Sequence, residues 1–172
     1  MNKSVFFCGV GGQGKTTTAN LIAPILDVPI IDGLSRGNPY PMGSEEGQNW
    51  LAREVGNKSA ASLRGYHRKG VYCRTPIDVY AYSSAYGKGR LDYQSDIMKS
   101  WLSTKPRIVY FPYLFKIEDD GFRPTDDTLA MTVDSLILEA LDMYSIRNSS
   151  RIHVASNSVP EQRVKEIIEF LS

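Results

Sequence analysis

Near the N-terminus the sequence reads Val5-Phe6-Phe7-Cys8-Gly9-Val10-Gly11-Gly12-Gln13-Gly14-Lys15-Thr16. The opening apolar run predicts a buried strand, and residues 9–16 match the pattern G-x-x-x-x-G-K-[ST] at every fixed position. Glycines let successive backbone N–H groups turn toward a phosphate, and the N-terminus of a following helix adds positive potential there. The stretch therefore predicts a strand, a phosphate-binding loop and a helix.

We expect this loop to bind ATP and Mg²⁺. Lys15 would supply a positive charge to the β- and γ-phosphates, and the Thr16 hydroxyl is an oxygen ligand for Mg²⁺. The residues expected at the nucleotide are Gly11, Gly12, Gln13, Gly14, Lys15, Thr16 and Thr17. The chain has no N-K-x-D stretch of the kind that reads guanine, which disfavours a GTPase.

The rest of the chain alternates short apolar runs with helical periodicity. We expect strands at residues 4–8, 28–31, 71–74, 107–111 and 151–155. Helices are expected at about 15–26, 43–69 with breaks near Gly56 and Gly65, from Pro76 onward, 91–102, 129–144 and at the C-terminus, where Val164, Ile167, Ile168 and Leu171 share one face. This order predicts one domain over residues 1–172, an α/β three-layer doubly wound sandwich with a five-stranded parallel sheet, which is the P-loop NTPase fold.

Composition and charge limit the function classes. Lys and Arg number 20 against 19 Asp and Glu, and the formal net charge of +1 excludes a strongly basic, histone-like surface. The distribution is uneven, since residues 53–74 hold six basic side chains against one acid and residues 118–142 hold eight acids against one base.

No apolar run reaches the roughly 18 residues of a membrane span, and no signal peptide is evident, so we expect a cytoplasmic protein. Cys8 and Cys73 are expected as reduced, packed thiols, and no pair of Cys or His has zinc-ligand spacing.

Two charged residues follow predicted strands. Asp32 follows the second strand, at the sheet edge where doubly wound folds bind ligands, and could accept a proton from an attacking hydroxyl or help to hold Mg²⁺. The alternative is a plain Asp-Gly turn. Arg74 ends the third strand, where a guanidinium needs an anion, either a substrate, a phosphate or Asp78. Neither residues 71–74 nor 108–111 end in the adjacent acids usual in hydrolytic ATPases, which favours transfer to a bound hydroxyl over transfer to water.

The chain resembles the small P-loop kinases of the nucleoside and nucleotide kinase superfamily, in the branch that includes the nicotinamide-riboside kinase domain. The resemblance is carried by the phosphate-binding loop, by Cys73-Arg74-Thr75-Pro76-Ile77-Asp78 and by Asp120-Gly121-Phe122-Arg123. The second stretch is similar to the family pattern D-R-[ST]-x-x-D, which implies a catalytic role for Arg74 and a substrate-binding role for Asp78. Cys73 stands where the family has an acid, so the expected base and metal ligand becomes Asp32.

The resemblance also implies the remaining parts of a kinase site. Residues 111–127 would form a lid in which Arg123 neutralises the transferring phosphoryl group, unless Arg123 only pairs with neighbouring acids in a surface loop. Arg163, after the fifth strand, would contact adenine. Residues 33–70 would form the acceptor pocket, with Arg36, Trp50 and Arg53 as candidate substrate-binding residues, because aromatic rings beside cations suit a flat heterocycle carrying sugar or phosphate groups.

The sequence therefore predicts an ATP- and Mg²⁺-dependent kinase that acts on a hydroxyl of a nucleoside, a nucleotide or a related small molecule. A second hypothesis uses the basic residues 53–74 to bind DNA, as a phage-type enzyme that phosphorylates a hydroxymethylated pyrimidine in the polymer. A third is a switch ATPase without an acceptor. Steep salt dependence would distinguish DNA from a small acceptor. The sequence leaves the oligomeric state open.

Overall fold

A computed structural model of the chain describes residues 4–32, 34–41, 43–65, 68–119, 121 and 125–172. Its centre is a five-stranded sheet in the order β2-β3-β1-β4-β5, with every neighbouring pair parallel. The strands are β1 (Val5–Gly9), β2 (Ile30–Ile31), β3 (Val71–Tyr72), β4 (Ile108–Phe111) and β5 (Ile152–Val154). The predicted α/β fold with a five-stranded parallel sheet is confirmed.

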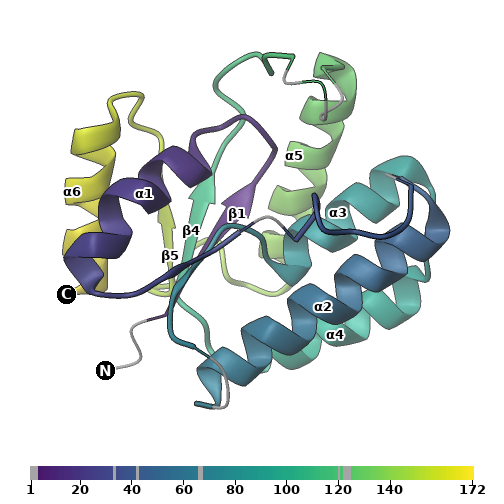
Figure 1. Ribbon diagram of the computed structural model, residues 1–172, viewed down its shortest axis with the longest axis horizontal. Coiled ribbons are helices and arrows are strands. Elements are labelled where there is room, and N and C mark those ends of the chain that lie inside the picture. The colour runs from purple at the N-terminus through teal and green to yellow at the C-terminus, as the bar shows by residue number, and fades with distance from the viewer. Residues whose placement is uncertain (1–3, 33, 42, 66–67, 120, 122–124) are drawn as a thin grey trace.

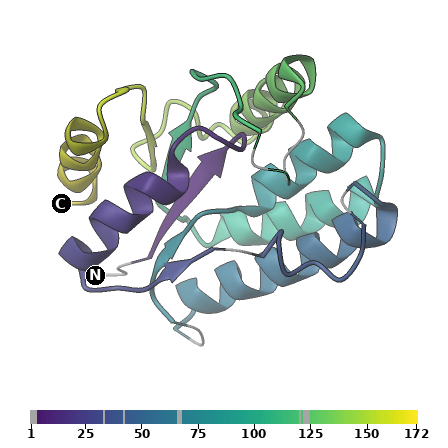
Figure 2. The same cartoon turned by 45° about the horizontal axis from the view of Figure 1, so that its top comes forward.

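Helices cover both faces of the sheet (Figure 1). One face carries α1 (Lys15–Leu26) and α6 (Pro160–Leu171), which pack against each other. The opposite face carries α3 (Pro76–Tyr86), α4 (Leu91–Ser103) and α5 (Asp127–Met143), and α2 (Glu45–Leu63) packs on α3 and α4. The view in Figure 2 shows α2 and α4 side by side on the far side of the sheet from α1.

The central strand explains why the sheet is buried on both faces. Val5 and Phe7 point into the core beneath α1 and α6, whereas Phe6 and Cys8 point into the core beneath α3, α4 and α5, and all four are fully buried. A parallel strand covered on both faces reads as a continuous apolar run, which is the pattern of this segment. Both cysteine thiols are free and buried, as predicted.

Helix α2 corrects the prediction of a break near Gly56. The helix runs without interruption from Glu45 to Leu63, after Ser44 caps it by accepting a hydrogen bond from the backbone of Gly47. A Cβ atom at Gly56 would collide with the side chain of Ile97 in α4, so this glycine allows two helices to approach closely. Gly65, with a φ of +82°, lies just beyond the end of the helix, close to the second predicted break.

The carboxyl ends of the parallel strands meet at one edge of the sheet, where the loops after β1, β2 and β3 come together. Gly9, the last residue of β1, has a φ of +143°, and a side chain there would collide with the carbonyl oxygen of Phe111 in β4. This edge holds the cavity described below. Among the helices that the structure describes, none is both long and apolar enough to cross a lipid bilayer.

Candidate active site

The phosphate-binding loop passes from β1 into α1 through two glycines with positive φ, Gly12 at +79° and Gly14 at +80°. Gly14 is the N-cap residue of α1, so the N–H groups of the first helical turn, which have no partner within the helix, lie at the cavity. Lys15 folds back over the loop, and its Nζ donates hydrogen bonds of 2.6 Å to the carbonyl oxygens of Gly9 and Val10. Burial lowers the pKa of Lys15, while the carboxylate of Asp78 opposes that shift. The loop and its cation thus have the arrangement expected for binding phosphates.

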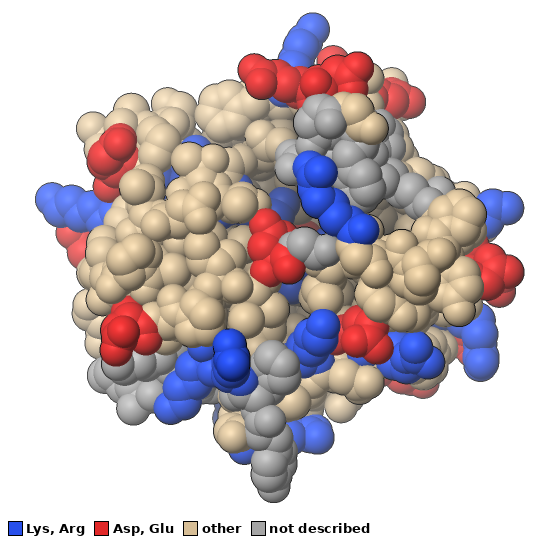
Figure 3. Space-filling model, in the orientation of Figure 1, with Lys and Arg blue, Asp and Glu red and all other residues tan. Residues whose placement is uncertain are grey.

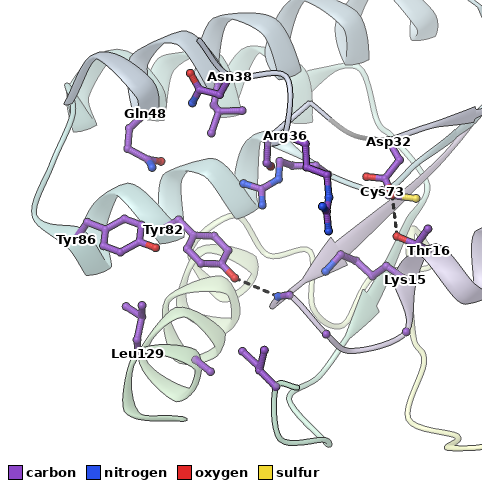
Figure 4. A pocket seen from close by; sticks show the side chains of 18 of the residues that line it. Lys15, Thr16, Asp32, Arg36, Asn38, Gln48, Cys73, Tyr82, Tyr86 and Leu129 are labelled. Atoms are coloured by element: carbon purple, nitrogen blue, oxygen red, sulfur yellow. Dashed lines mark hydrogen bonds between the residues drawn. The ribbon is translucent and has the colours of Figure 1, made fainter. Parts of the chain in front are cut away.

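Thr16 and Asp32 form a second feature of the cavity. The Thr16 hydroxyl donates a 2.7 Å hydrogen bond to Oδ2 of Asp32, which brings a residue of the first turn of α1 against the segment after β2 (Figure 4). A hydroxyl and a carboxylate side by side are the hard oxygen donors that Mg²⁺ uses when phosphate oxygens and waters complete its octahedron. The residues present therefore fit Mg²⁺.

Cys73 lines the cavity, and it occupies the position at which the kinase pattern D-R-[ST]-x-x-D has an acid. Burial, and then the nearby Asp32 carboxylate, raise the pKa of the Cys73 thiol to about 12. The thiol is consequently protonated near neutral pH and cannot act as a base there. Asp32, which also lines the cavity, supplies a carboxylate beside Cys73.

The cavity has a volume of about 420 Å³ and extends from the phosphate-binding loop to the helices on the opposite face of the sheet. Figure 3 shows the surface in the orientation of Figure 1, and it is hollowed near the centre of the view, where basic and acidic atoms lie close together. Its wall opposite the loop is supplied by α2, α3, α5 and the segment 35–40, through Ser35, Arg36, Asn38, Tyr40, Gln48, Leu51, Tyr82, Tyr86, Leu129 and Ala130. We call this set the acceptor wall.

Tyr82 connects the acceptor wall with the phosphate-binding loop. Its hydroxyl oxygen accepts a 3.1 Å hydrogen bond from the backbone N–H of Gly11, and the guanidinium carbon of Arg74 lies 5.4 Å from the centre of its ring. Because the oxygen accepts from Gly11, the phenol proton can be donated to a bound molecule. Arg74 lines the cavity, and its role toward an anion stays a prediction.

Gln48 is a buried polar residue of the acceptor wall that the sequence analysis missed. Its Oε1 accepts a 3.1 Å hydrogen bond from the hydroxyl of Ser83 in α3, which leaves the amide NH₂ group for a bound molecule. Gln48, Leu51, Ala52 and Val55 follow helical spacing and are all buried. A polar residue on that apolar face was the signal that could have identified it.

Three predicted substrate-binding residues lie elsewhere. The described lining of the cavity does not include Trp50, Arg53 or Asp78. Trp50 packs against the small apolar cluster between α2 and α3, and Arg53 has a side chain that is 58% exposed and lies 3.7 Å from Glu54. The physical reason is that α2 turns residues 48 and 51 toward the cavity, so that positions 50 and 53 point in other directions. Arg36 is the member of the predicted substrate set that does line it.

Asp78 has structural partners. It is buried, its Oδ1 accepts a 2.7 Å bond from the N–H of Gly9, and its Oδ2 accepts 2.6 Å bonds from the N–H and hydroxyl of Thr75. The Thr75 and Asp78 side chains form a capping box at the start of α3. Within the part of the chain that the structure describes, no ion pair joins Asp78 to Arg74. Asp78 thus fixes the start of the phosphate-binding loop to α3.

Arg163 was expected to contact the adenine, and Arg123 was expected to act in the lid. Arg163 is only 2% exposed and does not belong to the described cavity lining, so the structure does not bring it to an open base-binding surface. Arg123 lies outside the described residues, and its role stays a prediction.

Gln13 links the phosphate-binding loop to the predicted lid through its side chain. Its Oε1 accepts hydrogen bonds from the N–H groups of Leu114 (2.8 Å) and Phe115 (2.9 Å), and its Nε2 donates to the carbonyl oxygen of Phe115 (2.8 Å). The Gln13 side chain is 2% exposed, whereas Leu114 and Phe115 are exposed, so these bonds are partly buried. The first residues after β4 are therefore fixed to the loop that would bind the nucleotide.

No protein-family model matches the sequence, and no curated protein matches it either. Solved structures do match. NadR in complex with NR matches with a TM-score of 0.72 at 13% identity, over 98% of this chain and 51% of NadR. NadR in complex with NAD and AMP-PNP matches with a TM-score of 0.70 at 10% identity, over 98% of this chain and 49% of NadR. Deoxyadenosine kinase from M. mycoides, with the products dCMP and a flexible dCDP bound, has a TM-score of 0.68 at 11% identity over 98% of both chains. The chain spans about half the length of NadR. At these identities the likeness concerns the fold, and this chain has the fold of the P-loop nucleoside kinases.

Proposed function

We propose that the chain is an ATP- and Mg²⁺-dependent kinase that phosphorylates a hydroxyl group of a nucleoside, a nucleotide or a related small molecule. The observation that carries the proposal is the 2.7 Å hydrogen bond between Thr16 and Asp32 in a cavity that continues to a separate acceptor wall. A phosphate-binding loop needs only its own backbone to bind a nucleotide. The additional carboxylate and the additional wall are what a second substrate requires.

The chemical step assigns one role to each group. Asp32 accepts the proton of the acceptor hydroxyl as the oxygen attacks the γ-phosphorus, and the bond between that phosphorus and the β–γ bridging oxygen breaks to release ADP. Lys15 and Arg74 stabilise the negative charge on the transferring group. Thr16 and Asp32 would hold Mg²⁺, which neutralises phosphate charge when bound. Asp32 is therefore assigned two tasks, one toward the metal and one toward the acceptor hydroxyl.

The acceptor wall supports a small acceptor. A cavity of about 420 Å³ lies within the roughly 300–1,000 Å³ range of small-molecule sites. Tyr82 and Tyr86 offer ring faces, and Gln48 offers an amide NH₂ group, so a heterocycle with hydrogen-bonding edges would find partners there. Of the basic residues between positions 53 and 74, only Arg74 is in the described lining, so the geometry gives no specific support to DNA as the acceptor.

The experiment that tests the proposal incubates the chain with γ-labelled ATP and Mg²⁺ and follows the label. One acceptor pool holds nucleosides and nucleotides, and the other holds duplex DNA with thymine or with hydroxymethyluracil. Label on a small acceptor is the expected result. Label on modified DNA alone would replace the small acceptor by a polymer. Free phosphate alone would contradict the kinase proposal and leave an ATPase.

A further inference from the structure

Arg163 is a buried cation that the proposed chemical step does not use. It belongs to the first turns of α6, and its guanidinium carbon lies 5.4 Å from the centre of the Phe111 ring. Its Nε donates to the carbonyl oxygen of Asn157 (2.8 Å), and its Nη1 donates to the hydroxyl of Thr18 in α1 (3.3 Å). The side chain is thereby fixed against β4, the β5–α6 loop and α1.

No carboxylate lies within 4.0 Å of this guanidinium among the residues that the structure describes. Burial lowers the pKa of Arg163, and the more distant Glu166 opposes that shift. A desolvated cation without a paired anion destabilises a fold. Such a group is expected beside a site that receives negative charge.

Arg163 lies directly behind the phosphate-binding loop. A Cβ atom built on Gly14 would stand 2.6 Å from Nη1 of Arg163, which is the nearest heavy atom to that position. Gly14 itself lines the cavity and is the N-cap residue of α1. The guanidinium thus lies close to Gly14, a residue that also lines the cavity proposed to hold the phosphates.

We propose that Arg163 is a positioning residue for the nucleotide. Through Gly14 and Thr18 it holds the first turn of α1 in its phosphate-binding conformation, and its charge adds to the positive potential at the phosphates without contact to the base. The inference rests on the proposed function only in requiring that the loop binds a nucleotide, since no phosphoryl transfer is needed.

The alternative role for Arg163 is contact with adenine. Comparing the affinity for ATP with the affinity for inorganic tripolyphosphate distinguishes the two roles, because tripolyphosphate has the same phosphate chain and no base. A charge behind the loop affects both molecules equally, whereas a contact with adenine affects ATP alone. A purely structural role changes the unfolding temperature and leaves the affinities of the folded protein unchanged.

The experiment measures both affinities by calorimetry on the full chain and on the variants Arg163→Gln and Arg163→Lys. Arg107→Gln is the control, because Arg107 also stacks on a ring, that of Phe170, and donates to backbone carbonyl oxygens, but is exposed and lies away from the cavity. We expect Arg163→Gln to weaken ATP and tripolyphosphate alike by about tenfold, Arg163→Lys to recover most of that loss, and Arg107→Gln to change neither affinity.

Several outcomes would overturn the inference. Loss of ATP affinity with unchanged tripolyphosphate affinity would assign Arg163 to the base, and a folded Arg163→Gln with unchanged affinities would leave it a structural role. Where Arg163→Gln does not fold, Thr18→Val removes the bond to α1 and keeps the charge, and unchanged affinities for both molecules in that variant would contradict the positioning of α1 through Thr18. A wild-type chain that binds neither molecule contradicts the proposed function itself. Binding without turnover contradicts the kinase proposal and leaves the role of Arg163 to be judged on the affinities.

Discussion

The phosphate side and the acceptor side of the cavity are built in different ways. On the phosphate side one continuous segment, residues 9–18, supplies backbone groups, a lysine and a hydroxyl. On the acceptor side the wall comes from α2, α3, α5 and the segment 35–40, which are far apart in the sequence. Phosphate binding is therefore a local property of the sequence, whereas acceptor recognition depends on how several helices pack.

One buried hydrogen bond joins the two sides, and another holds two helices of the acceptor side together. Asp78 accepts from the N–H of Gly9 and fixes α3 to the phosphate-binding loop, and Gln48 accepts from Ser83 and fixes α2 to α3. Substitutions on the phosphate side should stop reactions with every acceptor. Substitutions on the acceptor side should change which acceptor reacts, and how well, while nucleotide binding is retained.

The largest effect is expected for Lys15→Ala. The variant loses the cation at the γ-phosphate, so phosphoryl transfer should fall by about 10⁴-fold or more for every acceptor in the panel. Transfer of γ-label to each acceptor checks this, and Lys105→Ala, far from the cavity, is the control. Activity of Lys15→Ala near the wild-type level would remove the assigned role of the loop.

Asp32→Asn is expected to lower kcat by about 10²- to 10⁴-fold, because an amide cannot accept the proton of the hydroxyl. Single-turnover kinetics measured over a range of Mg²⁺ concentrations separate the two tasks of this carboxylate. Recovery at high Mg²⁺ would make Asp32 a metal ligand, and a loss independent of Mg²⁺ would make it the base. Unchanged turnover would return Asp32 to the Asp-Gly turn.

Gln13→Ala tests whether the phosphate side controls the segment after β4. The change removes three partly buried hydrogen bonds to residues 114 and 115, and it should lower kcat about tenfold and the free energy of unfolding by about 1–3 kcal/mol. Amide hydrogen exchange should become faster in residues 113–117. Gln94→Ala is the control, because Gln94 is also buried but lies in α4, outside the cavity lining. Equal exchange in wild type and Gln13→Ala would show that the bonds do not restrain this segment.

The sequence was sufficient for the fold because the decisive signals were local. The apolar run at β1 and the loop after it follow directly from residue types, and helices α3, α4 and α5 start within two residues of their predicted positions. The break predicted at Gly56 was wrong because a glycine inside a helix has two physical uses. It can end the helix, or it can allow a neighbouring helix to approach, and only the position of Ile97 in α4 distinguishes them.

The site residues that could be predicted are those whose positions follow from the sequence immediately around them. Lys15, Thr16, Asp32 and Arg74 follow strand ends and meet at one sheet edge, so their positions could be inferred. Trp50 and Arg53 were chosen by residue type and lie on the wrong sides of α2. Gln48 and Tyr82 are recognisable only once α2 and α3 are packed together, because Gln48 is oriented by Ser83 and Tyr82 by Gly11.

The smallest effect is expected for Tyr82→Phe, and it makes the sharpest comparison between the two sides. The variant keeps the ring that stacks with Arg74 and loses the hydroxyl that accepts from Gly11 and can donate to the acceptor. We expect kcat/KM for the acceptor to fall about three- to tenfold, the magnitude of one net hydrogen bond, with ATP affinity within about twofold of wild type. Tyr86→Phe is the matched control, because Tyr86 lines the same cavity one turn later in α3 without a hydrogen bond to the loop. If Tyr82→Phe instead weakened ATP binding and left acceptor kinetics intact, Tyr82 would belong to the phosphate side. Helix α3 would then contribute to both the phosphate site and the acceptor wall, which would contradict a phosphate site formed by one local segment.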